Sequence, residues 1–117
     1  MSYLLLIVEP VGQRSERGLE AGKAVYDRMV NFAGDLQARG VLEAVNSLAS
    51  TDSAARLQMR NGKRHVLDGP FAEAKEMVGG FFLVNVATRE EAMAIAAECP
   101  AAEWATIEVR AVGPCYD

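Results

Sequence analysis

Two segments of this sequence are apolar at nearly every position, and they limit the possible folds more than any other feature. They are Tyr3–Val8 and Phe81–Ala87. A strand with one face in water alternates apolar and polar residues, so a strand that is apolar throughout is covered on both faces. Thr106–Val112 does alternate, as an edge strand does. The sequence therefore predicts two central strands and at least one edge strand.

Helical spacing appears twice between these strands. A first helix is expected over Glu20–Arg39, because apolar residues recur on one face and Gly40 can end it. That apolar set is Val25, Met29, Phe32, Ala33 and Leu36. A second helix is expected over Arg89–Glu98. It is preceded by Thr88 and has Glu91 three residues further on, which is the capping-box pattern.

A hairpin is predicted in the middle of the chain. Val41–Leu48 is expected to be a strand, and Ala55–Arg60 and Lys63–Leu67 flank Asn61-Gly62. Asn-Gly between two strands is a strong signal for a two-residue hairpin turn. The order is then strand, helix, strand, hairpin, strand, helix, strand. Without the inserted hairpin, this is the split βαβ pattern of an α+β, ferredoxin-like fold, in which the first and third core strands are central.

Two helices can cover only one face of such a sheet. Half of the apolar side chains of Tyr3–Val8 and Phe81–Ala87 would then face water, and monomers rarely expose large apolar patches. We therefore expect a homodimer, with a second copy packed against the open face. At 117 residues, we expect a single domain over residues 1–117.

Charge and cysteine content exclude several classes of protein. Sixteen acidic residues against twelve basic ones give a net charge of −4 with no basic block, so we expect no nucleic-acid partner. The single histidine and the spacing of Cys99 and Cys115 match no zinc site or disulfide framework, so we expect neither a metal nor a cofactor. No apolar run is long enough to span a membrane, and the first residues resemble a strand rather than a signal peptide. We therefore expect a cytoplasmic protein with reduced thiols.

The candidate functional segment is DGPFAEAKEMVGGFF, residues 68–82. Asp68 can form an Asx turn, in which its carboxylate accepts hydrogen bonds from the following amides and Gly69 supplies an unusual backbone angle. Alternatively, Asp68 is a partly buried carboxylate at the mouth of a pocket. Gly79-Gly80 is expected to permit a sharp turn into the central strand, although the close approach of a ligand would require the same residues.

The remaining polar residues of this region give weaker signals. Glu73, Lys75 and Glu76 form either a solvated loop or the rim of a cleft. The predicted hairpin register places His65 opposite Gln58, on a polar face, so we interpret His65 as a solvated surface residue. Cys99 lies on the inward side of the second helix and is not expected to act as a nucleophile.

The segment DGPFAEAKEMVGGFFLVNV resembles the signature of the DGPF-domain family within the YCII-related superfamily. The flanking segments YLLLIVEP and ECPAAEWATIEVRAV are similar to that family as well. The resemblance implies a ferredoxin-like fold that assembles as a dimeric α/β barrel. It also implies a His–Asp pair in the YCII branch, but Met29 stands here at the histidine position, so that pair is not carried over. The association of some DGPF proteins with alternative sigma factors suggests regulation or sensing.

Three functions follow as hypotheses. The preferred one is a small-molecule binding or sensing homodimer. Its cleft would lie between the sheet and the Asp68 loop and would be lined by Asp68, Glu73, Lys75 and Tyr3. The second is an enzyme that uses Asp68 as a general acid or base, with one of these residues or Tyr26 nearby. The third is an interaction module without a ligand.

Overall fold

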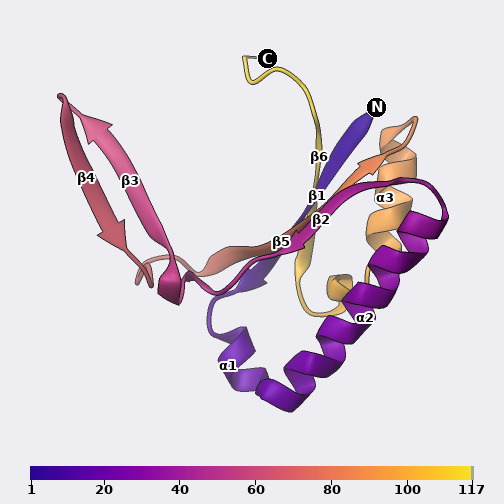
Figure 1. Ribbon diagram of the computed structural model, residues 1–117, viewed down its shortest axis with the longest axis horizontal. Coiled ribbons are helices and arrows are strands. Elements are labelled where there is room, and N and C mark those ends of the chain that lie inside the picture. Colours follow the sequence, from indigo (N-terminus) through magenta and orange to yellow (C-terminus); the bar gives the residue numbers. More distant parts are fainter. Residues whose placement is uncertain (117) are drawn as a thin grey trace.

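A four-stranded antiparallel sheet forms the body of the molecule, which is described here from a computed structural model that covers residues 1–116 (Figure 1). The strands lie in the order β2-β5-β1-β6. Their bounds are Ser2–Pro10 for β1, Leu42–Ser47 for β2, Glu76–Asn85 for β5 and Thr106–Ala111 for β6. The two apolar strands β1 and β5 are central, as predicted. The sheet has two open edges, β2 and β6, so this single chain is an α+β protein and not a closed barrel.

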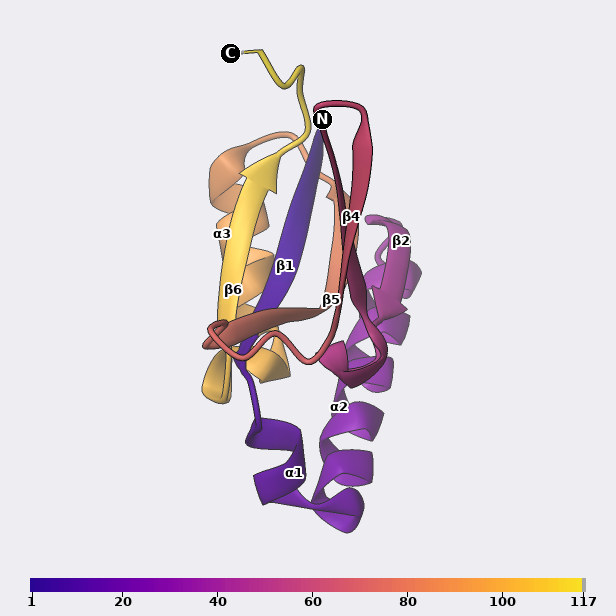
Figure 2. The ribbon, with the colours of Figure 1, turned by 90° about the vertical axis from the view of Figure 1, so that its left-hand side faces the viewer.

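Two long helices, α2 (Leu19–Ala38) and α3 (Arg89–Glu98), lie on one face of the sheet (Figures 1 and 2). The α3 cap is close to the predicted one. The amide of Glu91 donates to Thr88 Oγ1 at 3.2 Å, and the Glu91 carboxylate accepts from the amide of Ala87 at 3.0 Å, one residue earlier than expected. No helix among residues 1–116 is both long and apolar enough to cross a membrane.

A short helix, α1 (Gln13–Arg17), precedes α2 and was not predicted. It contains no apolar residue, so it leaves no periodic signal in the sequence. Gly18 separates α1 from α2 with a positive φ of 84°, a backbone angle that favours glycine. Two short 3₁₀ helices lie at Thr51–Ser53 and Pro100–Glu103.

The core lies between the helices and the face of the sheet that they cover. Alternate residues of β1 point into it: Tyr3, Leu5 and Ile7 are 6%, 0% and 7% exposed. They pack with side chains from β5, α2 and α3, among them Phe82, Val84, Phe32, Leu36, Ala92 and Ile95. The other alternate set lies on the face without helices and is only partly buried: Leu4, Leu6, Val8, Phe81 and Leu83. This confirms that the helices leave one apolar face uncovered.

The predicted hairpin is present and forms a separate two-stranded sheet of β3 (Ala55–Arg60) and β4 (Lys63–Asp68). Its register pairs Gln58 with His65, as expected. Asn61 and Gly62 have φ angles of 52° and 73°, as a type I′ turn requires. We call residues 55–68 the arm. Figures 1 and 2 show that the arm stands away from the sheet, on the side opposite the helices.

The arm makes the chain unusually extended. The radius of gyration of the Cα atoms is 16.1 Å, whereas a compact domain of this length has about 13 Å. All of residues 55–68 are exposed, so the arm adds surface without adding to the core. The described fold is therefore a two-layer body that carries a projecting hairpin.

We expect His65→Ala to change the free energy of unfolding by no more than about 0.5 kcal/mol, as for most surface substitutions. His65 is exposed on the arm. Urea denaturation would measure this change, with Leu36→Ala as the control. Leu36 is fully buried in the core, and its truncation should cost about 2–5 kcal/mol. A loss of several kcal/mol for His65→Ala would show that the arm packs differently.

Candidate functional site

The strands β1 and β5 pair irregularly at the end that carries the candidate segment. Ile7 lies opposite Gly80 but Val8 lies opposite Val78, so Gly79 is an additional residue in β5. This is a β-bulge, which bends a strand and redirects the side chains beside it. The bulge comes directly before Glu9 and Pro10, where β1 ends.

An ion pair between a buried carboxylate and a partly exposed arginine occupies the space beside the bulge. Glu9 is only 6% exposed and lies on the helix-covered face. Arg14 of α1 donates two hydrogen bonds to its carboxylate, from Nε to Oε2 at 3.0 Å and from Nη2 to Oε1 at 2.7 Å. Such a bidentate pair is strong and has a defined geometry. Arg14 also donates to the carbonyl oxygen of Leu48 at 2.9 Å, so it joins the end of β1 to the segment after β2.

The two glycines of the candidate segment are needed for space rather than for turning. Neither Gly79 nor Gly80 has a positive φ, so the predicted sharp turn is wrong. A Cβ on Gly79 would overlap Oε1 of Glu9, and a Cβ on Gly80 would lie 2.8 Å from the carbonyl oxygen of Asn46. The glycines therefore admit the ion pair on one side and the close approach of β2 on the other.

The turn after the arm also differs from its prediction. Gly69 does not have a positive φ, so it supplies no unusual backbone angle. A Cβ at this position would overlap the carbonyl oxygen of Thr51, and the Gly69 amide donates to the carbonyl oxygen of Ala54 at 2.7 Å. The Gly69–Pro70 peptide bond is cis. Gly69 is thus required because the chain passes close to the residues before β3.

Asp68 lies at the end of β4, exposed and opposite Ala55. Within residues 1–116 its carboxylate accepts no hydrogen bond from the amides that follow it. The Gly69 amide donates instead to the carbonyl oxygen of Ala54. The predicted Asx turn is therefore not formed. In the single chain the Asp68 side chain is exposed and lines neither of the depressions described below.

The other three predicted site residues do not gather around Asp68. Glu73 and Lys75 are exposed in the loop between β4 and β5, where the carbonyl oxygen of Lys75 accepts from the amide of Val11 at 2.9 Å. Tyr3 is buried in the core, near the opposite end of β1 from this loop. Six residues separate it from Glu9, which is roughly 20 Å along a strand. Tyr26 is exposed on α2.

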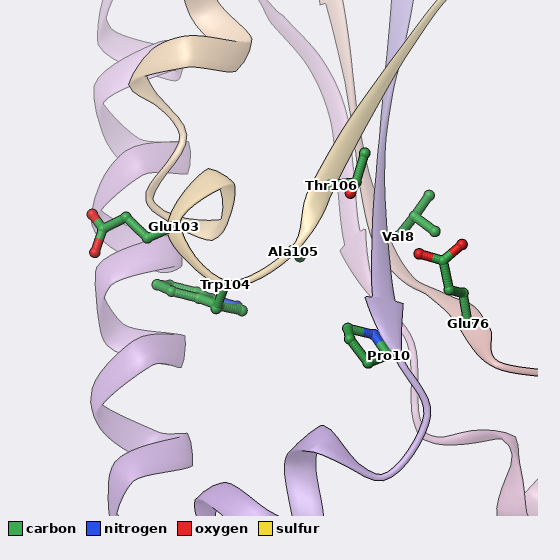
Figure 3. Close-up of a pocket in the computed structure, with 7 residues that line it drawn as sticks. All are labelled: Val8, Pro10, Glu76, Glu103, Trp104, Ala105 and Thr106. Atoms are coloured by element: carbon green, nitrogen blue, oxygen red, sulfur yellow. The ribbon is translucent and has the colours of Figure 1, made fainter.

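Two shallow depressions, each of about 250 Å³, lie beside the end of β1 and share Val8 and Glu76. Figure 3 shows the first, in which the Glu76 carboxylate lies beside Val8 while Glu103 points away from it. Its lining residues are Val8, Pro10, Glu76, Glu103, Trp104, Ala105 and Thr106. The second is lined by Val8, Thr51, Arg56, Ala74, Glu76, Met77 and Val78.

The side chains at the far end of the first depression already contact other residues of the chain. Arg28 donates to Glu103 at 2.6 Å and thereby lowers the pKa of that carboxyl. The guanidinium groups of Arg17 and Arg28 each lie 5.5 Å from the centre of the Trp104 ring. Gln13 donates to the carbonyl oxygen of Trp104 at 2.8 Å, which links α1 to the loop before β6. These contacts make this end of the depression structural.

The second depression offers a more versatile set of groups. Glu76 supplies a carboxylate, and Arg56, whose guanidinium carbon lies 3.8 Å from the centre of the Phe71 ring, supplies a cation. Val8 and Val78 form an apolar floor between them. Such a set can hold a small molecule that carries both apolar and charged parts. The sequence pattern places Glu76 in a solvated loop or at the rim of a cleft and gives no signal for Arg56, because only the tertiary structure brings the two together.

The described residues contain few groups suited to catalysis. Among residues 1–116, no three His, Cys, Asp or Glu side chains cluster in a way that could hold a metal ion. Cys99 is buried, and burial raises the pKa of its thiol, which disfavours the reactive thiolate. This agrees with its expected role as an inward helix residue. Met29, at the position where the family resemblance implies a histidine, is partly buried and packs against the core.

The α+β fold and the bulged end of its central strands therefore define a small domain with an open, partly apolar site. Comparison with known proteins identifies the family: the YCII-related domain matches residues 1–115, and the chain belongs to that family. A protein of Rhizobium meliloti (strain 1021), Uncharacterized protein R00369, is 44% identical over 54 residues. These residues are 46% of this chain and 44% of the relative, so the match spans less than half the length of that protein.

We expect Arg14→Met to lower the free energy of unfolding by about 3 kcal/mol, because it leaves the Glu9 carboxylate buried without a partner. The double variant Glu9→Leu/Arg14→Met should recover most of this loss. Arg39→Met is the control, since Arg39 pairs with Glu98 at the surface, and its effect should be clearly smaller. Urea denaturation of the variants measures all of these changes. Equal losses for Arg14→Met and Arg39→Met would contradict the role given to the buried pair.

We expect Asp68→Asn and Asp68→Ala to unfold within about 0.5 kcal/mol of the unmodified protein, because Asp68 is exposed. Gly69→Ala is the contrasting variant and should be clearly destabilising, since its Cβ would overlap Thr51. Thermal and urea denaturation would measure both. If Asp68→Ala alone lost about 1–3 kcal/mol, the carboxylate would be satisfying buried amides after all.

Proposed function

We propose that this YCII-related chain is a small-molecule binding or sensing homodimer. Its ligand would lie over the end of β1, between the open face of the sheet and the loop that follows Asp68. The observation that carries the proposal is the uncovered apolar face formed by Leu4, Leu6, Val8, Phe81 and Leu83. An apolar face of this kind is rare on a monomer unless it serves binding or assembly.

The exposed area supports an assembly. The chain has an accessible surface of 7954 Å², whereas a compact monomer of 12.6 kDa exposes about 6,200 Å². The excess of about 1,750 Å² is larger than the roughly 800 Å² that each partner buries in an interface of standard size. A second copy packed on the open face would remove much of this excess. This is the arrangement of a ferredoxin-like chain in a dimeric α/β barrel, as the DGPF resemblance implies.

The chemistry of the site favours binding over catalysis. Asp68 lines neither depression, so a general acid–base role for it has no support in the geometry. The second depression combines an apolar floor with Arg56 as a cation, which suits a ligand that has an apolar body and an anionic group.

The test uses 1-anilinonaphthalene-8-sulfonate as a probe, because it is apolar and carries one sulfonate. We expect its fluorescence to report binding, and we expect Arg56→Ala to weaken that binding about fivefold, which corresponds to about 1 kcal/mol. Arg89→Ala is the matched control, because Arg89 is an exposed arginine at the start of α3. Equal weakening in both variants would show that the ligand site lies elsewhere.

The assembly is tested on the same samples. Multi-angle light scattering at micromolar concentration should give twice the mass of the 12.6 kDa chain. A monomer mass would remove the dimer from the proposal. It would leave the probe experiment as a separate test of the ligand site, because the depressions lie within one chain.

A further inference from the structure

The arm makes little contact with its own chain. All of the residues of β3 and β4 are exposed on both faces of the hairpin. At its base Arg56 lies over the Phe71 ring, and Gly69, the residue after the arm, passes close to Thr51. An isolated two-stranded hairpin is marginally stable in water. The regular register and the Asn-Gly turn of the arm therefore suggest that it is built to pack on something outside its own chain.

One face of the arm is mostly apolar. Leu57 and Val66 are opposite one another, and Met59 follows on the same face, where it lies opposite Arg64. The three apolar side chains are 55%, 51% and 55% exposed, although residues of this kind are usually buried. The other face carries mainly polar and basic residues together with one leucine: Arg56, Gln58, Arg60, Lys63, His65 and Leu67. The arm therefore presents an exposed apolar cluster with one arginine beside it.

The charge of the arm is opposite to that of the body. Arg56, Arg60, Lys63 and Arg64 against Asp68 give the arm a net charge of +3. The rest of the chain therefore has −7, since the whole chain has −4. Two surfaces of opposite charge attract one another, whereas two surfaces of like charge repel one another. The body of another copy of this chain carries a net charge that is complementary to that of the arm.

The position of the arm agrees with this partner. Figures 1 and 2 show the arm on the side of the sheet that has no helices, where it stands off from the open face. A second body packed on the open face would lie on the same side of the sheet as the arm. We propose that the arm packs its Leu57, Met59 and Val66 face on the second copy, so that each subunit of the dimer is clasped by the arm of the other.

This inference rests on the proposed homodimer but can fail separately from it. The register offers a matched pair of variants, because Leu57–Val66 and Gln58–His65 are adjacent pairs on opposite faces of the arm. We expect Leu57→Ser/Val66→Ser to raise the dimer dissociation constant by at least about a hundredfold, since each of the two arms loses two apolar contacts. Gln58→Ser/His65→Ser should leave it within about threefold, because that face is polar. Analytical ultracentrifugation measures both constants.

A second measurement remains informative if the double variant unfolds. A photo-crosslinking benzoylphenylalanine at position 59 is introduced into a mixture of unlabelled and ¹⁵N-labelled chains, and the crosslinked peptides are identified by mass spectrometry. We expect peptides that join a labelled chain to an unlabelled one. Crosslinks confined to single chains in a protein that is still dimeric, or equal dissociation constants for the two variant pairs, would overturn the clasp and leave the dimer standing. A monomeric protein would overturn both.

Nucleic acid is the other occupant that a basic arm could have. It is tested with a fluorescent 20-base-pair duplex and the variant Lys63→Glu/Arg64→Glu. We expect no duplex binding by the unmodified protein at 150 mM salt, and we expect this variant to weaken the dimer, because it removes the charge complementarity. Duplex binding that this variant abolishes while the dimer mass stays the same would assign the arm to nucleic acid and overturn the proposal.

Discussion

The central strands β1 and β5 are apolar on both faces, while α2 and α3 cover only one. The main features of the molecule follow from this imbalance. The covered face forms the core around Leu5, Leu36 and Val84. The uncovered face keeps Leu4, Leu6 and Phe81 partly exposed, and their burial requires another surface. In this chain the hairpin does not fold back to supply it, and the homodimer proposed above would cover this face.

The ion pair of Glu9 and Arg14 organises the end of the sheet where the candidate site lies. It needs the additional residue Gly79 in β5, because any side chain there would occupy the position of the carboxylate. Arg14 connects β1 to the segment that follows β2. A buried charge pair contributes little net stability by itself but is costly to break. Its main effect here is therefore to define one geometry for the strand ends.

The proposed functions of the site and of the arm are linked through Arg56. This residue lines the second depression with Glu76 and also belongs to the arm. If the arm clasps a second copy, the position of Arg56 depends on the assembled dimer. The affinity for a ligand held by Arg56 would then depend on the contact between the subunits, and the bound ligand would in turn change the strength of that contact. Such coupling is reciprocal, since a ligand that favours one arrangement of the arm is itself bound more tightly by that arrangement.

Local sequence patterns were sufficient to predict the helices and strands that depend mainly on neighbouring residues. Periodicity predicted α2, the Thr88 cap predicted α3, and Asn61-Gly62 predicted the arm with its register. The alternation of residues also distinguished central strands from edge strands. The structural roles of Asp68, Gly69, Gly79 and Glu9 became clear only from the tertiary structure. Turn statistics assign Asp and Gly to backbone angles, whereas here the glycines are required by the approach of Thr51, Asn46 and Glu9. The distance between two residues that are far apart in the chain depends on how the strands and helices pack. No local pattern of residues predicts that distance.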